Sequence, residues 1–501
     1  MTAPTTPITT YASTPRRRVP PPSSPRGRAG VPRWVWGLAA AAGCLVPLLV
    51  LLPGPEGGLP AAGRTTLVVF TAAVLAWMFG RLDDTFVGLS AVLALVLTGV
   101  LDADTMFGSL GGETIWLLIA AFVLAAGLSE TGLPARIAVL LISHARTVRQ
   151  LAHLITVALL LTALAVPATS GRAALVLPVF LALAKVLRAR PAVVRALAVL
   201  FPTVILLSAV ATLIGAGAHL ITSQILAGST GSGIGYGQWL LLGAPFAVLS
   251  SHLAGELVLL LMTSRADRAA PLAIDADRLG ALSQTRVTGA LSVPQRKALA
   301  TLCAVVLLWC TETAHGLSPA LVALLGAIAV TAPRLGTVGM GAALASIPWS
   351  LLLFMASTAA LGGALASSGA ADWLTGALFG SADGSPTTFL VGVVLASTAA
   401  HLVLQSRSAR SSVLVPLLIP LAVSFGMNPA AVAFASTVAS GFCHTLPSSA
   451  KPVAMFGAVT DVPTYRRADL LRLSAFLGPL MAVLVLAFAL FVWPSLGLPL
   501  Y

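Results

Sequence analysis

The sequence predicts an all-α polytopic membrane protein built from two related halves. Of its 501 residues, 57% are hydrophobic and only 9% are charged, whereas a soluble protein carries about 25% charged residues. Segments without any Lys, Arg, Asp or Glu recur along the chain at close to bilayer-spanning length, as in 34–52, 86–101, 151–166 and 473–493. Because a helix satisfies its own backbone in lipid, we expect roughly ten to twelve spans.

The basic residues predict the orientation of the chain. The formal net charge is +13, and Lys and Arg gather in the first 33 residues, in 184–195 and in 265–297. Short basic stretches beside apolar spans are typical of cytoplasmic loops, so we expect a cytoplasmic N-terminus. No charged side chain follows Arg472, which predicts an external C-terminus. This distribution indicates a lipid bilayer rather than nucleic acid as the partner, and a location in the cell (plasma or inner) membrane.

Three segments of the first half recur in the second half, in the same order. The pairs are "LSETGLPARI" (128–137) with "LASSGAADWL" (365–374), "SGRAALVLP" (170–178) with "SARSSVLVP" (408–416), and "SAVAT" (208–212) with "STVAS" (436–440). Their offsets of 237, 238 and 228 residues are nearly constant, which indicates a tandem repeat. Secondary transporters are often built from two such repeats of inverted topology.

This repeat divides the chain into five predicted parts. The tail is rich in Pro, Ser, Thr and Arg, a composition that cannot bury a core. The parts are a disordered cytoplasmic tail (1–33), N-terminal scaffold helices (34–112), a first transport repeat (113–262), a cytoplasmic linker (263–297) and a second transport repeat (298–501).

Both repeats carry a polar cluster that is followed by an apolar run and a proline. In inverted-repeat transporters the substrate lies near the midplane, between broken helices. Hydroxyls and free backbone N–H groups at a helix start can hold an oxyanion, and arginine grips a carboxylate bidentately. The predicted substrate-binding residues are Thr169, Ser170, Gly171, Arg172, Ser406, Arg407, Ser408 and Arg410. In the alternative interpretation, the arginines snorkel or bind helix-end carbonyls, and the hydroxyls bond to the backbone one turn back.

At these residues the chain resembles the divalent anion:sodium symporter (DASS) family of the ion-transporter superfamily, over roughly 65–495. The segments 114–138 and 349–374 are similar to the family's segments that begin each repeat, and 237–249 and 425–440 add to the match. The resemblance implies an inner-membrane homodimer with about eleven transmembrane helices and two re-entrant hairpins. It also implies an elevator-type mechanism, with di- or tricarboxylates or sulfate as substrates, usually in symport with sodium.

The chain departs from the family's motifs at the positions tied to sodium. Asparagines are missing from both hairpin motifs, and also from the two loop motifs, which become "TSQI" (222–225) and "AKPV" (450–453). The candidates for coupling in these loop regions are Thr222, Ser223, His219, His444 and Lys451. A fixed cation opposes a neighbouring sodium ion, so we hypothesise that arginines and Lys451 replace sodium. The protein would then be a uniporter, an exchanger or a proton-coupled carrier rather than a strict sodium symporter. Histidine as a proton relay is an alternative.

Two other functions remain open at this stage. A cation/proton antiporter or an arsenite- or citrate-type permease belongs to the same superfamily, but an antiporter should keep buried acids where this chain has arginines. A non-transporting membrane scaffold or sensor is the other alternative. No nucleophile elbow, P-loop or zinc-protease motif is present, and the four cysteines lack metal spacing, so we predict no enzyme activity and no metal or cofactor beyond sodium or a proton as coupling ion.

Overall fold

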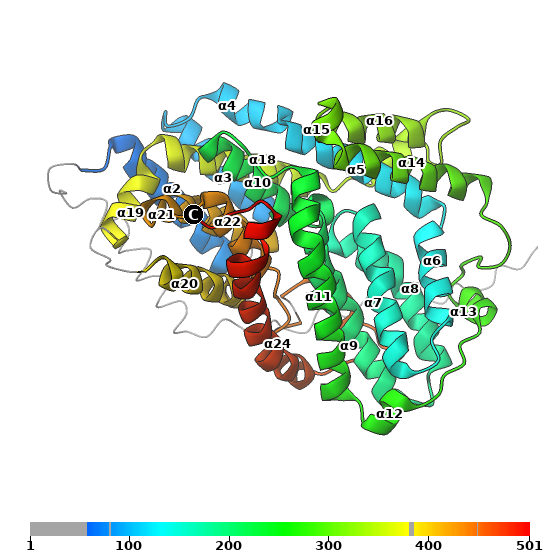
Figure 1. Cartoon of the computed structure of the whole chain (residues 1–501). Helices are drawn as coiled ribbons and strands as arrows, with labels where there is room; N and C mark the ends of the chain where they lie inside the picture. Colours follow the sequence, from blue (N-terminus) through cyan, green and yellow to red (C-terminus); the bar gives the residue numbers. More distant parts are fainter. Residues whose placement is uncertain (1–57, 80–81, 380–384, 448) are drawn as a thin grey trace, which may run out of the picture.

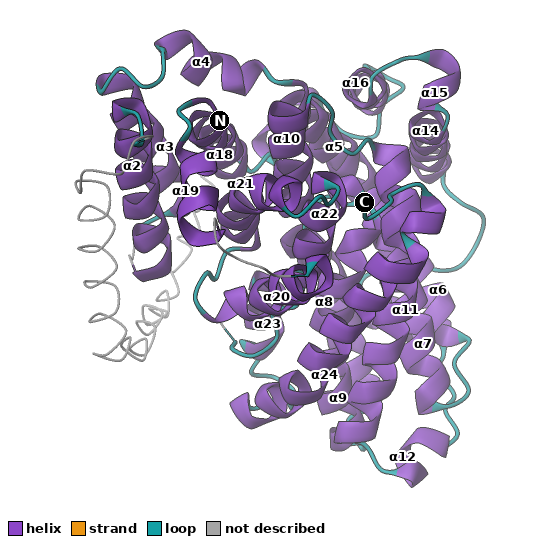
Figure 2. Ribbon diagram, turned by 60° about the vertical axis from the view of Figure 1, so that its left-hand side comes forward, coloured by secondary structure: helices purple, strands orange, loops and turns teal. Residues whose placement is uncertain are grey.

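The computed structural model describes residues 58–79, 82–379, 385–447 and 449–501 (Figure 1). The predicted tail and the apolar segment 34–52 lie outside the described residues. Within the described part every regular element is a helix, and the only β contact is an isolated bridge between Thr147 and Pro271 (Figure 2). The prediction of an all-helical fold is therefore confirmed.

The helices of the first half are joined by short turns. In chain order they are α2 (Ala61–Phe79), α3 (Asp84–Leu97), α4 (Ala103–Gly108), α5 (Glu113–Glu130), α6 (Leu133–Ser143), α7 (Val148–Ala165), α8 (Thr169–Val186), α9 (Pro191–Ser208), α10 (Gly217–Thr230) and α11 (Tyr236–Met262). Two short helices, α12 (Arg265–Ala269) and α13 (Ala276–Leu282), form the basic linker.

The second half repeats this order with one extra turn, α15 (Glu312–His315), near its start. Its other helices are α14 (Val293–Cys310), α16 (Pro319–Thr331), α17 (Met340–Ala345), α18 (Trp349–Ser367), α19 (Ala370–Phe379), α20 (Pro386–Ala399), α21 (Arg407–Ser424), α22 (Pro429–Ala439), α23 (Lys451–Gly457) and α24 (Arg467–Ala487). Several begin at residues suited to a helix start. Asn428 caps α22 ahead of Pro429, and Ser292 and Gln295 form a capping box at α14.

Nine helices of the described residues are long and apolar enough to cross a membrane, and five shorter apolar helices accompany them. The segment that joins α9 to the turn after it, Pro191–Ala211, is almost wholly buried within the protein. It lies among α7, α8, α11 and α23 (Figure 2). A helix buried on all sides needs no polar face, which is why apolar residues occur around its whole circumference, with Arg195 near its start as the charged exception.

Helices at equivalent positions in the two halves pack against helices of the opposite half. α5 packs against α16, and α18 packs against α3. In the same way α10 packs against α21 and α22, whereas α23 packs against α8 and α9. The two halves therefore interlock, because a helix near the end of each half packs against two helices of the other half.

An ionisable cluster ties α7 to α11 at one end of the molecule. Oε1 of Glu256 lies 2.6 Å from Nε of Arg149 and 2.6 Å from Nε2 of His153. The Nδ1 atoms of His153 and His252 are 2.8 Å apart. The side chain of Glu256 is 26% exposed, so this cluster lies at the surface of the bundle and not in its centre.

Candidate functional site

Two pairs of consecutive helices turn back on themselves at matching places in the halves. α7 and α8 are joined at 166–168, and α20 and α21 at 400–406. In α8 the interval from the first residue to its proline, Thr169 to Pro178, equals the interval from Arg407 to Pro416 in α21. We call these pairs hairpin 1 (α7–α8) and hairpin 2 (α20–α21). The predicted polar clusters thus lie at the first turns of α8 and α21.

The tip of hairpin 1 contains a strained residue. Ala168 has φ 65° and ψ 134°, a conformation that favours glycine. Thr169 and Ser170 follow it and are half-buried, whereas Gly171 is exposed. Strained backbone of this kind persists only where the surrounding structure holds it, and it is frequent at functional sites.

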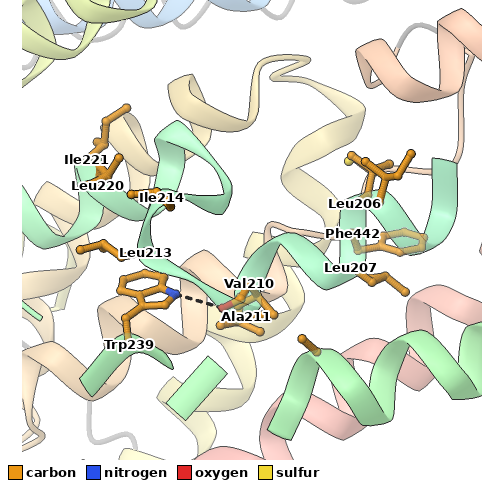
Figure 3. Close-up of a cluster of buried hydrophobic side chains, with 14 of the residues drawn as sticks. Leu206, Leu207, Val210, Ala211, Leu213, Ile214, Leu220, Ile221, Trp239 and Phe442 are labelled. Carbon is orange, nitrogen blue, oxygen red and sulfur yellow. Dashed lines mark hydrogen bonds between the residues drawn. The ribbon is translucent and has the colours of Figure 1, made fainter. Parts of the chain in front are cut away.

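The helix after hairpin 1 breaks at residues 209–216, between α9 and α10 (Figure 3). Nε1 of Trp239 donates to the Val210 carbonyl at 3.0 Å, and the hydroxyl of Thr212 donates to the Ala163 carbonyl of α7 at 3.0 Å. A Cβ on Gly243 would lie 2.1 Å from the Val210 oxygen, so only glycine allows α11 to approach this closely. These contacts satisfy backbone groups that the break leaves without helical partners.

A second irregular segment, residues 440–447 with 449–450, follows α22. The ring centroids of Phe442 and His444 lie 5.3 Å apart, and Nδ1 of His444 accepts from the Cys443 N–H at 3.3 Å. Nε2 of His444 is buried and has no hydrogen-bond partner among the described residues. The second irregular segment approaches the end of α9, as Phe442 beside Leu206 and Leu207 shows (Figure 3).

Arg172, in the first turn of α8, is completely buried and holds the end of α9. Its Nη1 donates to the Ile205 carbonyl at 3.1 Å, and its Nη2 donates to the hydroxyl of Ser208 at 2.7 Å. Nη2 also donates to the Leu159 carbonyl of α7 at 2.6 Å, and Nε to the hydroxyl of Thr162 at 3.0 Å. Every nitrogen of this guanidinium is engaged within the protein.

Arg410, in the first turn of α21, is also completely buried and holds the segment after α22. Nη1 donates to the carbonyls of Ser440 at 2.5 Å and Phe442 at 3.2 Å. Nε lies 3.5 Å from the Ser406 carbonyl. Nη2 has no hydrogen-bond partner among the described residues. Arg172 and Arg410 thus bind the ends of equivalent helices, but of the two only Arg410 has a nitrogen without any hydrogen-bond partner.

Arg407 connects hairpin 2 to the first half of the chain. Nη2 donates to Nε2 of His219 on α10 at 3.1 Å, and Nη1 lies 3.4 Å from the Leu206 carbonyl. A Cβ on Gly441 would lie 2.8 Å from Nη2, so the guanidinium also touches the second irregular segment. Its Nε has no partner in the described part of the chain.

The remaining predicted residues divide between the tip of hairpin 2 and α10. The hydroxyl of Ser406 accepts from the Ala409 N–H at 3.3 Å, and a Cβ on Gly217 would lie 3.0 Å from the hydroxyl of Ser408. The carboxylate of Asp84 lies near the hydroxyl of Ser406 and near the exposed Lys451. Asp84 was not among the predicted residues, because its place at the start of α3 gives no motif.

The structure corrects the interpretation of 222–225 as a loop. Thr222 and Ser223 lie within α10, and the break in the backbone comes earlier, at 209–216. The hydroxyl of Thr222 lies 2.6 Å from that of Thr437 on α22, and Ser223 donates to the Ile234 carbonyl at 2.9 Å. The break falls where Gly215 lets the chain fold onto the Ala209 carbonyl, because a Cβ there would lie 2.1 Å from that oxygen.

The guanidiniums of Arg172, Arg407 and Arg410 meet no carboxylate. Within the described residues, the ion pairs are those of Glu256 with Arg149 and His153. In addition to the unpaired donors of Arg407 and Arg410, the hydroxyl of Ser411 is buried without a partner. A buried charge without a counter-charge costs several kcal/mol. The arrangement can lower this cost by binding an anion.

A cavity of about 480 Å³ lies elsewhere, at the start of α7. It is lined by residues 143–146 and 272–275, including Arg146 and Asp275. The arginine cluster contacts the other end of α7, at Leu159 and Thr162. We assign the site to the guanidiniums because the cavity is open to the surface and offers no buried donor.

A family model described as the sodium:sulfate symporter transmembrane region matches residues 33–498. The chain belongs to this family. The match confirms the resemblance drawn from the sequence and shows that this member of the sodium:sulfate symporter family is a multi-pass membrane transporter.

Two relatives match this chain at 26% identity. A membrane protein of Cupriavidus necator is 26% identical over 407 residues, which cover 77% of this chain and 78% of that protein. The putative malate transporter YflS of Bacillus subtilis is 26% identical over 159 residues, covering 30% of this chain and 33% of that one.

Two solved transporters share the fold. The Alcanivorax borkumensis YdaH transporter has a TM-score of 0.53 at 17% identity, covering 87% of this chain and 99% of its own. Neisseria gonorrhoeae MtrF, described as one of a class of antimetabolite efflux pumps, has a TM-score of 0.51 at 13% identity, covering 91% of this chain and 99% of its own. At these identities the likeness concerns the fold alone.

Proposed function

We propose that this member of the sodium:sulfate symporter family exchanges small dianions, most directly dicarboxylates, without sodium. The observation that carries the proposal is the group of buried guanidiniums with no carboxylate partner. Two of them, Arg407 and Arg410, keep unpaired donors beside the second irregular segment. Arginine is suited to this role because its planar donors match the two oxygens of a carboxylate.

The same charges disfavour a sodium ion at this place. Sodium would have to lie beside fixed cations, and like charges at such distances repel strongly in a low-dielectric interior. The protein's own guanidiniums therefore serve as counter-charge for the substrate. Sodium can leave a carrier together with the substrate, whereas arginine cannot.

This difference favours exchange over net uptake. After an anion is released, the empty site keeps its positive charges, and an uncompensated arginine at the bilayer centre costs about 2.5–3.5 kcal/mol or more. A returning anion removes this penalty. We therefore infer that the loaded carrier reorients much faster than the empty one.

The choice of a dicarboxylate rests on two lines of support. The unpaired donors lie on two separate guanidiniums, which suits a substrate with two anionic groups. YflS, which is similar over part of the chain, carries the printed name of a putative malate transporter. Sulfate and a tricarboxylate are therefore tested as substrates beside a dicarboxylate.

We also propose the arrangement in the membrane. The N-terminus and the 263–297 linker are cytoplasmic, the C-terminus is external, and the protein is a homodimer. The transport repeats 113–262 and 298–501 move against the N-terminal helices. The clustering of basic residues supports the orientation, and the family resemblance supports the dimer and the elevator motion.

The experiment is uptake of labelled succinate, citrate and sulfate into proteoliposomes, with sodium or potassium as the only cation. The proteins are the wild type, Arg410→Ala and Glu256→Gln, the last as a matched control outside the site. We expect wild-type exchange to be equal in both cations, lost in Arg410→Ala and kept in Glu256→Gln. Uptake that vanishes without sodium would overturn the proposal, and binding without transport would favour the scaffold or sensor.

A further inference from the structure

His219 occupies a fixed place between the broken segment of the first half and hairpin 2 of the second. It is completely buried. Its ring stacks on Trp239 with centroids 4.9 Å apart and planes at 28°. Trp239 is itself held by the Val210 carbonyl and by an edge-to-face contact with Phe434, at 4.8 Å between centroids. The imidazole therefore has little freedom to turn.

The hydrogen bonds of His219 define which nitrogen carries the proton. A guanidinium has donors only, so the Nη2 of Arg407 at 3.1 Å requires an unprotonated Nε2 on His219. Nδ1 lies 3.0 Å from the Thr212 carbonyl, which is an acceptor. His219 is therefore neutral, with its proton on Nδ1.

The charged groups that face His219 keep it neutral. α10 packs against α21, which carries Arg407 and Arg410, and against α18 and α22, which have no charged side chain. The guanidinium of Arg172 is a further positive neighbour of Arg407. A second proton on the ring would place a cation 3.1 Å from the guanidinium of Arg407. Proton relay through His219 is therefore disfavoured.

We propose that His219 is a positioning residue for anion binding. Its Nε2 holds Nη2 of Arg407, and so keeps that guanidinium beside the second irregular segment with Nε unpaired. The inference rests on the proposed function, in which Arg407 binds the anion. A site whose binding group is held by a second, fixed group loses less freedom when ligand arrives.

Two substitutions test the roles of the two ring nitrogens of His219 separately. In His219→Gln the side-chain oxygen reaches about as far as Nε2 and can accept from Arg407, whereas the bond to Thr212 is lost. In His219→Asn the amide reaches about as far as Nδ1 and can donate to Thr212, whereas Arg407 loses its acceptor. Both variants remove the stacked ring, and they differ from each other by a single methylene group.

The test measures the exchange of labelled succinate in proteoliposomes for His219→Gln, His219→Asn and Arg407→Gln, and for His219→Asn combined with Arg407→Gln. We expect His219→Asn to raise KM about tenfold, His219→Gln to rescue most of this loss, and the double variant to equal Arg407→Gln. KM ratios should stay constant between about pH 6 and pH 8, the range in which a free histidine titrates.

Three results would contradict the proposal. Equal KM values for His219→Asn and His219→Gln, or an additive double variant, would show that the ring acts only by packing. A KM ratio that changes with pH would restore the proton relay. An Arg407→Gln variant with wild-type exchange would instead refute the proposed function, on which the positioning role depends.

Discussion

Arg407 of the second half donates a hydrogen bond to His219 of the first half, across 3.1 Å. The two residues are 188 positions apart in the chain, and this bond brings hairpin 2 onto the break between α9 and α10. The contact lies beside unpaired donors on Arg407 and Arg410. The two halves of the chain thus build the candidate site together.

Arg172 should matter for folding more than for substrate. Arg172→Met would remove all four hydrogen bonds of the buried guanidinium, and a hydrogen bond to a charged group contributes about 1.5–3 kcal/mol. Arg410→Met loses fewer bonds, since Nη2 has no partner. We expect a clearly lower unfolding midpoint in detergent for Arg172→Met, and loss of exchange with a smaller shift for Arg410→Met. Equal shifts would contradict this division of roles.

The strain at Ala168 predicts a stabilising substitution. Glycine adopts φ 65° without the Cβ penalty, so Ala168→Gly should raise the free energy of unfolding by up to about 1 kcal/mol. Ala173→Gly, in the interior of α8, is the control and should lower it by about 0.5–1 kcal/mol. Thermal unfolding of both variants measures the effect. If Ala168→Gly destabilises as much as the control, the tip is not strained in the folded protein.

Gly243 should tolerate no side chain. Its Cβ would lie 2.1 Å from the Val210 oxygen, the same oxygen that accepts from Trp239. Overpacking of this kind costs about 1–3 kcal/mol or more, so Gly243→Ala should reduce the yield of monodisperse protein. Gly363→Ala is the matched control, because nothing lies within 4 Å of its Cβ. Similar yields for both would mean that α11 can shift away from the break.

The cluster around Glu256 should contribute little to transport. The partner side chain of Arg149 is 64% exposed, and exposed ion pairs contribute about 0–1 kcal/mol. Glu256→Gln should therefore leave the KM for succinate unchanged and shift the unfolding midpoint only slightly. A large rise in KM would show that α7 and α11 must be tied together for hairpin 1 to hold substrate.

The fold could be predicted from the sequence, because hydrophobic segment length and charge position depend on the bilayer and not on tertiary detail. The positions of Arg172 and Arg410 were also accessible, since both lie in a polar cluster before a proline. The different hydrogen-bond partners of these two arginines could not be predicted. Arg172 is saturated by backbone carbonyls of Leu159 and Ile205, and a carbonyl leaves no trace in residue type.

Other features of the site leave only a weak signal in the amino-acid sequence. Ser411 follows Arg410 directly, but a buried serine without a partner looks like any serine in the sequence. Trp239 lies in an apolar segment, and only the fold brings its ring onto His219. The sequence predicts this break at 222–225, further along the chain than the observed 209–216, because the family's loop motif falls there when no gap is allowed.

The most direct test of the account compares labelled succinate uptake into proteoliposomes that are either empty or loaded with unlabelled succinate, with no sodium present. Because the empty site carries uncompensated arginines, we predict that loading accelerates uptake by about a hundredfold, which corresponds to about 2.7 kcal/mol for the empty return step. Arg407→Gln should reduce this acceleration. Empty liposomes that fill as fast as loaded ones would contradict the claim that fixed arginines make this transporter an exchanger.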